Sequence, residues 1–137
     1  ARKAAAWSRS SAHNRAQVLY YLAENLSARA PEFEKRLSDL TAVGKKRAQQ
    51  EVAASLERLF YYAAWADKYD GRVHATPVRS VTLAMHEPWG VMGLSCPDEA
   101  PLLAFISLVA PCVAMGNRVV VTPSPRLPLA ATDLYQV

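Results

Sequence analysis

The stretch EPWGVMGLSCPDEAPLLAFISLVAPCVAMGNRVVVTP, residues 87–123, contains the pattern of a strand, a loop, a helix and a second strand. Residues 90–94 and 118–122 are short apolar runs bounded by Gly, Pro and Asn, as buried strands usually are. The apolar residues that recur between them at helical spacing are Leu102, Leu103, Phe105, Ile106, Val109 and Val113. Two parallel strands joined by a crossover helix fit this length, so the sequence predicts a βαβ unit.

The loops that follow the two strands are where chemistry is expected, because βαβ units bind ligands at the carboxyl ends of their strands. These loops are residues 95–101 and 122–128. Residues 127–137 have the pattern of a further helix, but no third strand follows in the 137 residues. Two strands alone would leave an apolar face uncovered. We therefore expect the chain to be a fragment of a larger protein.

Composition argues against several classes of protein. The chain is 51% hydrophobic and 20% charged with only 5 Gly, which disfavours disorder and low complexity. Its longest uncharged run, residues 100–117, contains two prolines, so no membrane span is expected. With no secretory signal and 2 Cys, a cytoplasmic location is the expectation. The net charge of +4 is scattered, and no aromatic residues interleave with the basic run at residues 45–47, so no nucleic-acid partner is expected.

Helical patterns fill residues 1–70. Ser11 is a predicted N-cap of a helix that runs to Ala30, Pro31 fits the first turn of a second helix, and a third follows Gly44. The residues expected to be buried are Leu19, Leu22, Ala23 and Leu26 in the first helix, Phe33, Leu37 and Leu40 in the second, and Val52, Leu56, Leu59, Phe60, Ala63 and Ala66 in the third. The basic run at the start of the third helix opposes the helix dipole, so we expect fraying or a carboxylate partner there.

Residues 71–88 change to a β pattern. Strands are expected at residues 72–76 and 78–86, on either side of a break at Pro77. In the second strand Val81, Leu83 and Met85 alternate with small or polar residues, which gives it one apolar face. This segment precedes the first parallel strand and cannot be part of the crossover. We predict an antiparallel arm that covers the sheet or pairs with another chain.

Four motifs follow one another in the chain: EVAASLERLFYYAAWADKYDG at residues 51–71, EPWGV at 87–91, APCVAMGN at 110–117 and VVVTPS at 119–124. Their order and spacing resemble the aldehyde dehydrogenase superfamily over nearly the whole chain. The loop CPDEAP, residues 96–101, running into LLAF and SLVAP, is similar to family 16. Members of that family have two aldehyde-dehydrogenase-like domains, the second of which lacks the catalytic cysteine, and the resemblance places this chain in the second.

The resemblance implies an α/β fold that is the N-terminal portion of an aldehyde-dehydrogenase-like Rossmann-type domain. Residues 1–70 would form its helical layer, residues 71–88 an antiparallel oligomerisation arm, and residues 89–137 the first βαβ unit and the start of the next helix. The domain would be incomplete. The nucleophilic cysteine, the general base and the glycine motif of the family would lie beyond Val137.

Two departures from the family's active pattern bear on chemistry. Glu99 stands where active relatives have an Asn amide, which donates a hydrogen bond to the oxyanion formed when a thiolate attacks the aldehyde. An ionised carboxylate only accepts hydrogen bonds and would repel an oxyanion. Active relatives read Lys-Pro-x-Glu where this chain has Thr-Pro-Ser-Pro at residues 122–125. The cofactor-binding positions Thr122, Ser124 and Pro125 are thus degenerate, and we expect neither a catalytic residue nor a bound cofactor in this segment.

Other polar residues have a structural interpretation beside a functional one. Cys96 lies at a strand end beside the expected cleft, but no histidine is near it in sequence, so a buried small side chain is favoured over a nucleophile. Cys112 occupies a core helix position. Asp98 and Glu99 resemble an acid–base pair, yet as neighbours before a helix they are favoured as its cap or dipole partners. The three histidines share no metal-ligand spacing with one another or with the cysteines, so no metal site is expected: His13, His74 and His86.

Three functions from different classes remain. The favoured one is a structural and assembly module, a pseudoenzyme domain whose partners are the remainder of its own polypeptide and a second copy in a homodimer, with NAD bound only by a catalytic partner domain. The second is part of a working NAD-dependent aldehyde dehydrogenase, which oxidises an aldehyde to a carboxylic acid through a cysteine thiohemiacetal. The third is a small-molecule binding module that keeps the cleft for another ligand.

Overall fold

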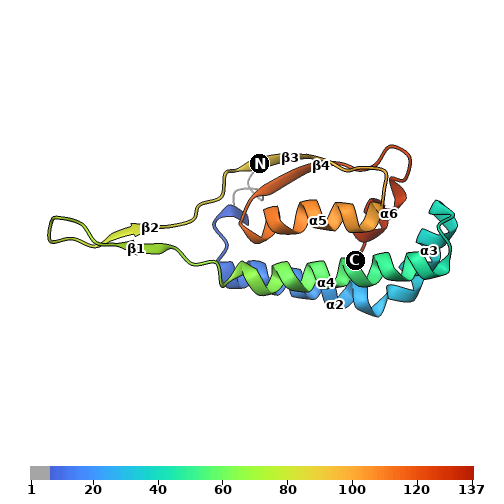
Figure 1. The fold of residues 1–137 in the computed structure, drawn as a ribbon, viewed down its shortest axis with the longest axis horizontal. Coiled ribbons are helices and arrows are strands. Elements are labelled where there is room, and N and C mark those ends of the chain that lie inside the picture. The colour runs from blue at the N-terminus through green and yellow to red at the C-terminus, as the bar shows by residue number, and fades with distance from the viewer. Residues whose placement is uncertain (1–6) are drawn as a thin grey trace.

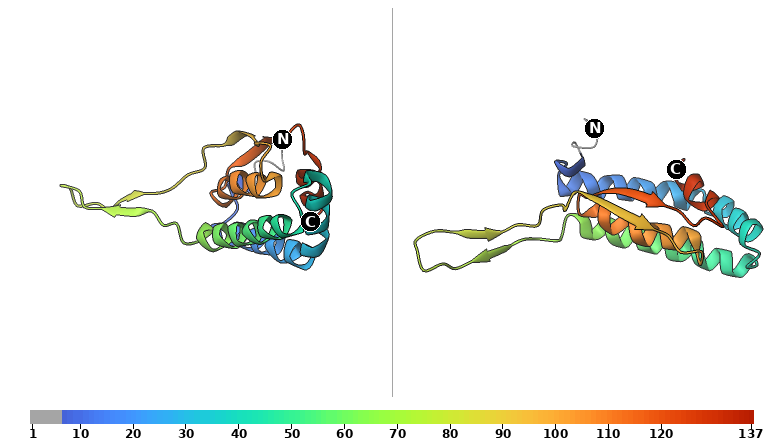
Figure 2. Two further views of the ribbon diagram at one scale, coloured as in Figure 1. Left: turned by 45° about the vertical axis from the view of Figure 1, so that its right-hand side comes forward. Right: turned by 90° about the horizontal axis from the view of Figure 1, so that it is seen from above.

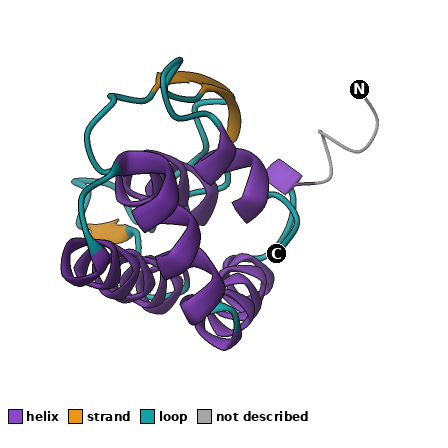
Figure 3. Cartoon of the chain, turned by 90° about the vertical axis from the view of Figure 1, so that its right-hand side faces the viewer, coloured by secondary structure: helices purple, strands orange, loops and turns teal. Residues whose placement is uncertain are grey.

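A computed structural model describes residues 7–137, so the first six residues of the expected helical layer lie outside the described part of the chain. Figure 1 shows a helical body and a long hairpin that projects from one end of it. The elements are α2 (Ala12–Ala28), α3 (Ala30–Thr41), α4 (Lys45–Ala66), β1 (Arg72–His74), β2 (Thr82–Ala84), β3 (Val91–Ser95), α5 (Pro101–Ala114), β4 (Arg118–Thr122) and α6 (Leu129–Leu134). Seen end-on, helices make up most of the body and the strands lie at its margin (Figure 3).

The helical layer forms where the apolar periodicity predicts it. The Ser11 hydroxyl accepts a hydrogen bond from the Asn14 N–H at 3.1 Å and caps α2, and Pro31 lies in the first turn of α3. The long helix α4 packs against α2, α3 and α5, so it is the central element of the body. The large aliphatic side chains most completely buried in the shared core are Leu26, Leu37, Leu59, Leu102 and Ile106, and Phe33 belongs to the same core.

Two residues expected in this core are not buried. Leu40 is 36% exposed and Phe60 is 38% exposed, so both predictions were wrong. Leu40 lies in the last turn of α3, at a cleft described below, rather than over the core. Phe60 lies beside the buried stripe of α4, which runs through Leu59 and Ala63, and its ring packs against Tyr20 with centroids 6.2 Å apart. Neighbours on a helix point about 100° apart, so Phe60 lies at the edge of the stripe on which Leu59 faces the core.

The first turn of α4 carries the three basic residues of the sequence. The helix begins at Lys45 with no side-chain cap. No carboxylate within residues 7–137 forms an ion pair with Lys45, Lys46 or Arg47. The carboxylate partner that was one of two expectations for this run is therefore not found in the described part of the chain.

Strands β3 and β4 pair in parallel, which confirms the βαβ unit. Their register runs from Val91 opposite Arg118 to Ser95 opposite Thr122. The ladder continues past Ser95, where the Cys96 N–H donates to the Thr122 carbonyl at 2.9 Å. Helix α5 packs on one face of this sheet.

At the end of the body nearest the arm, Arg15 of α2 donates hydrogen bonds to two other segments. Its Nε donates to the Ala114 carbonyl at 2.8 Å, and its Nη1 donates to the Ser10 carbonyl at 2.6 Å. One guanidinium thus joins the start of α2 to the end of α5. Pro111 lies within α5, which continues through it to Ala114.

The arm is an antiparallel hairpin, in the register Arg72 opposite Ala84 to His74 opposite Thr82. Its strands are shorter than the predicted residues 72–76 and 78–86. They shorten because Pro77 has no N–H to donate, while the Thr76 hydroxyl bonds to the turn itself, at 2.9 Å from the Val78 carbonyl. The two views in Figure 2 show the arm extending well away from the body.

None of the helices within residues 7–137 combines the length and apolar character that crossing a lipid bilayer requires.

Candidate functional site

The loops that follow β3 and β4 meet at one edge of the sheet, as parallel pairing requires. A cleft of about 540 Å³ opens there, between these loops, the start of α5 and the junction of α3 with α4. Two arginines and three carboxylates line it, and they are Arg47, Arg126, Glu51, Asp98 and Glu99. The cleft is therefore polar, charged with both signs, and located where ligands of βαβ units bind.

The two loops are tied together by a hydrogen bond between Asp98 and Ser124. The Ser124 Oγ donates to Asp98 Oδ1 at 2.6 Å, and it accepts from the N–H groups of Arg126 at 3.2 Å and Leu127 at 3.1 Å. Ser124 is only 2% exposed. Its single donor and both its lone pairs are used inside the protein. The hydroxyl has nothing left to offer a ligand.

The amino end of α5 is capped by Glu51, from the second turn of α4. Glu51 Oε1 accepts from the Leu102 N–H at 2.9 Å and from the Leu103 N–H at 3.3 Å, and Glu51 is 9% exposed. A carboxylate here satisfies two of the orphan donors of the helix and complements its dipole. The residue at the N-cap itself is Ala100, in the left-handed conformation and without a side-chain cap.

The interpretation of Asp98 and Glu99 as the helix cap was therefore wrong. Asp98 accepts from Ser124 instead, and Glu99 is exposed. The interpretation failed because Ala100 turns the backbone with a φ of 46°, while a side chain from another helix already meets the α5 amides. Glu51 was not singled out from the sequence. The signal was present, since Glu51 is a charged residue on the same helical stripe as the buried Val52 and Ser55.

The residues predicted at degenerate cofactor positions lie in different environments. Ser124 is buried beside the cleft, whereas Thr122 and Pro125 are exposed and do not line it. Thr122 ends β4 and uses its carbonyl in the sheet, as an acceptor for Cys96. Glu99 lies at the rim of the cleft. The structure thus places Glu99 in the lining of the cleft and bonds Ser124 to the lining residue Asp98, whereas Thr122 and Pro125 do not line the cleft.

The cysteines lack the surroundings that activate a thiol. Cys96 is buried, and desolvation raises the pKa of its thiol above the ordinary value. Cys112 is half-buried in α5, and desolvation raises the pKa of its thiol as well. A raised pKa disfavours the thiolate that attacks an aldehyde. Both cysteines behave as small apolar side chains in this fold.

The histidines make separate contacts. His86 stacks on Tyr69 with ring centroids 4.3 Å apart, and His13 Nδ1 lies 3.7 Å from Asp67 Oδ2. His74 is in β1 of the arm. Within residues 7–137 no three His, Cys, Asp or Glu side chains come together as metal ligands.

A parallel strand–helix–strand unit with a cleft at its carboxyl edge is typical of α/β domains of the Rossmann type. The helical layer and the projecting arm distinguish this chain from other α/β domains of that type. The chain belongs to the aldehyde dehydrogenase family, whose family model matches residues 1–137.

Individual relatives agree with this assignment. The cytosolic 10-formyltetrahydrofolate dehydrogenase of Pongo abelii is 34% identical over 136 residues, covering 96% of this chain. An aldehyde dehydrogenase of Agaricus bisporus is 34% identical over 129 residues, covering 88%. The solved structure of PnpE in complex with nicotinamide adenine dinucleotide matches with a TM-score of 0.94 at 25% identity, over 98% of this chain. The expected aldehyde-dehydrogenase-like Rossmann-type fold is confirmed.

The chain spans a minor part of each of these proteins. It covers 15% of the Pongo abelii relative, 24% of the Agaricus bisporus relative and 28% of the PnpE chain.

Proposed function

We propose that this chain is part of an aldehyde-dehydrogenase-like domain that performs no catalysis and serves the structure and assembly of an aldehyde dehydrogenase. The observation that carries the proposal is the Asp98–Ser124 contact at the carboxyl edge of the sheet. A ribose that used this edge would have to compete with hydrogen bonds that the protein already makes, because the Ser124 hydroxyl is saturated.

Glu99 supports the absence of catalysis in this domain, because of its effect on an oxyanion. It places an exposed carboxylate at the rim of the cleft, beside Asp98. Stabilising an oxyanion requires donors aimed at the developing negative charge. A carboxylate offers only acceptors, so Glu99 raises the energy of an oxyanion held near it.

The relatives support a place for this domain in a larger enzyme. The solved structure of PnpE is a complex with nicotinamide adenine dinucleotide. That complex is consistent with NAD as the cofactor of a catalytic domain elsewhere in the polypeptide to which this chain belongs. We assign the chain to the second, non-catalytic domain of a family 16 protein, with the rest of that polypeptide as its first partner. The cytosolic relative supports a cytoplasmic location.

The arm is the assembly element of this proposal. Val81 is 75% exposed, and Leu83 of β2 and Met85 just after it, at alternate positions along the same segment, are exposed too. An exposed apolar strand face on a hairpin is a pairing surface for another chain. We propose that it contacts a second copy in a homodimer.

The assembly proposal is tested in the full-length protein by Val81→Asp with Leu83→Asp, with mass read by sedimentation equilibrium. The charges are expected to shift the protein to a smaller species, because they would be buried without partners. The matched control is Thr82→Asp with Ala84→Asp, on the opposite face of β2. An unchanged mass for the first pair would rule out the arm as an interface.

The non-catalytic proposal is tested by titrating the full-length protein with NAD and measuring aldehyde oxidation. One NAD per polypeptide, with turnover that survives removal of the Glu99 carboxylate by Glu99→Ala, is the expected result. Stoichiometric NAD bound at the cleft beside Ser124, with turnover there, would instead identify a working dehydrogenase domain. Thr122→Lys with Pro125→Glu is expected to raise NAD binding at this domain, and Ser124→Ala alone is the control for simply loosening the loop.

A further inference from the structure

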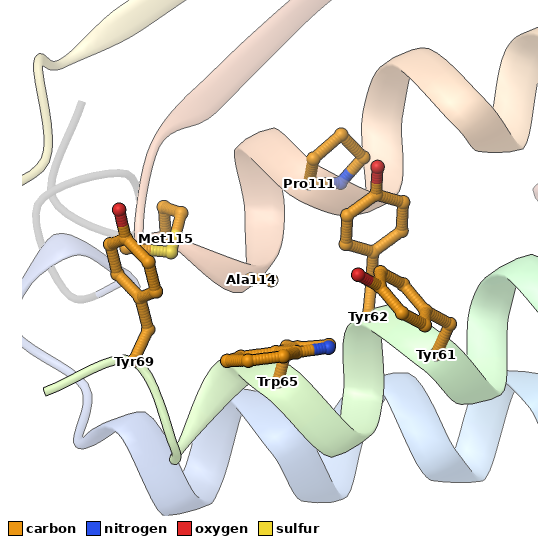
Figure 4. Close-up of a pocket in the computed structure, with 7 residues that line it drawn as sticks. All are labelled: Tyr61, Tyr62, Trp65, Tyr69, Pro111, Ala114 and Met115. Atoms are coloured by element: carbon orange, nitrogen blue, oxygen red, sulfur yellow. The ribbon is translucent and has the colours of Figure 1, made fainter.

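We draw no further inference here: the strongest candidate, the open apolar groove between the carboxyl ends of α4 and α5 that is lined by Tyr61, Trp65 and Met115 among others (Figure 4), carries no proposal, because nothing within the described residues 7–137 shows what covers it.

Discussion

The body and the arm of this molecule have apolar residues in opposite environments. In the body, leucines of α2, α3 and α4 meet those of α5 in one core that excludes water. In the arm, every residue from 77 to 87 is exposed, including Val81 and Leu83. The body therefore holds itself together by burial, whereas the arm is held by a short ladder between two three-residue strands.

This contrast separates residues that serve the fold from residues that serve a partner. Burial of a leucine contributes about 2 kcal/mol to folding, but an exposed leucine contributes almost nothing until another surface covers it. A two-stranded hairpin by itself is marginally stable in water. Apolar residues kept on such an element have their energetic effect in assembly rather than in folding.

The largest expected effect contrasts one core residue with one arm residue. Leu59→Ala empties a fully buried position between the helices and is expected to lower the free energy of unfolding by about 2–5 kcal/mol. Leu83→Ala on β2 is expected to change that free energy by less than about 0.5 kcal/mol under conditions where the protein is monomeric. Urea unfolding followed by circular dichroism measures both. Equal losses would mean that the arm belongs to the cooperative body.

The next effect concerns the polar contact that joins α4 to α5. Glu51→Ala leaves the N–H groups of Leu102 and Leu103 buried without an acceptor, at an expected cost of about 1–3 kcal/mol. Glu51→Gln keeps an oxygen acceptor and is expected to cost less than half as much. Glu57→Ala, an exposed glutamate of the same helix, is the control. A neutral Glu51→Ala in urea unfolding would show that water replaces the carboxylate.

A smaller effect, an increase in the free energy of unfolding, is expected at the end of α3. Ala42 is the C-cap there and has a φ of 52°, in the left-handed region that glycine adopts without strain. Ala42→Gly is expected to raise the free energy of unfolding by about 1 kcal/mol. Ala28→Gly, near the end of α2 in ordinary helical conformation, is expected to lower it instead. Thermal melts of the two variants should shift in opposite directions.

The smallest effect is a pH dependence at the surface of the body. The hydrogen bond from Arg29 lowers the pKa of Glu32, and the charges of Arg29 and Arg36 act in the same direction. A carboxyl whose folded pKa is lowered stabilises the fold above its unfolded pKa, and that contribution is lost as the pH falls through the folded pKa. Arg29→Ala is expected to raise the NMR titration midpoint of Glu32. The stability difference between the variant and the natural chain should shrink in acid.

The strands and helices followed from the sequence where local pattern decides the structure. The valine run of β4 and the apolar spacing of α5 each specify an element within their own residues. Leu40 and Phe60 were assigned wrongly because periodicity gives the direction of a stripe but not its edges. The family resemblance supplied the assembly of these elements into one aldehyde-dehydrogenase-like domain, which local patterns alone do not determine.

The site was harder to predict because its contacts join residues far apart in the chain. Asp98 and Ser124 are 26 residues apart, and Glu51 is 51 residues from the Leu102 amide that it caps. Sequence spacing carries no signal for such pairs. Only the meeting of the two loops at one edge followed from the parallel topology.

The hydrogen bonds by which Arg15 joins α2 to the end of α5 have a consequence for folding during synthesis. The acceptor on Ala114 lies 99 residues further along the chain. Synthesis proceeds from the amino end, so α2 leaves the ribosome long before that carbonyl exists. During synthesis, the side of the helical layer that packs against α5 therefore stays exposed to solvent and to chaperones until α5 has been made.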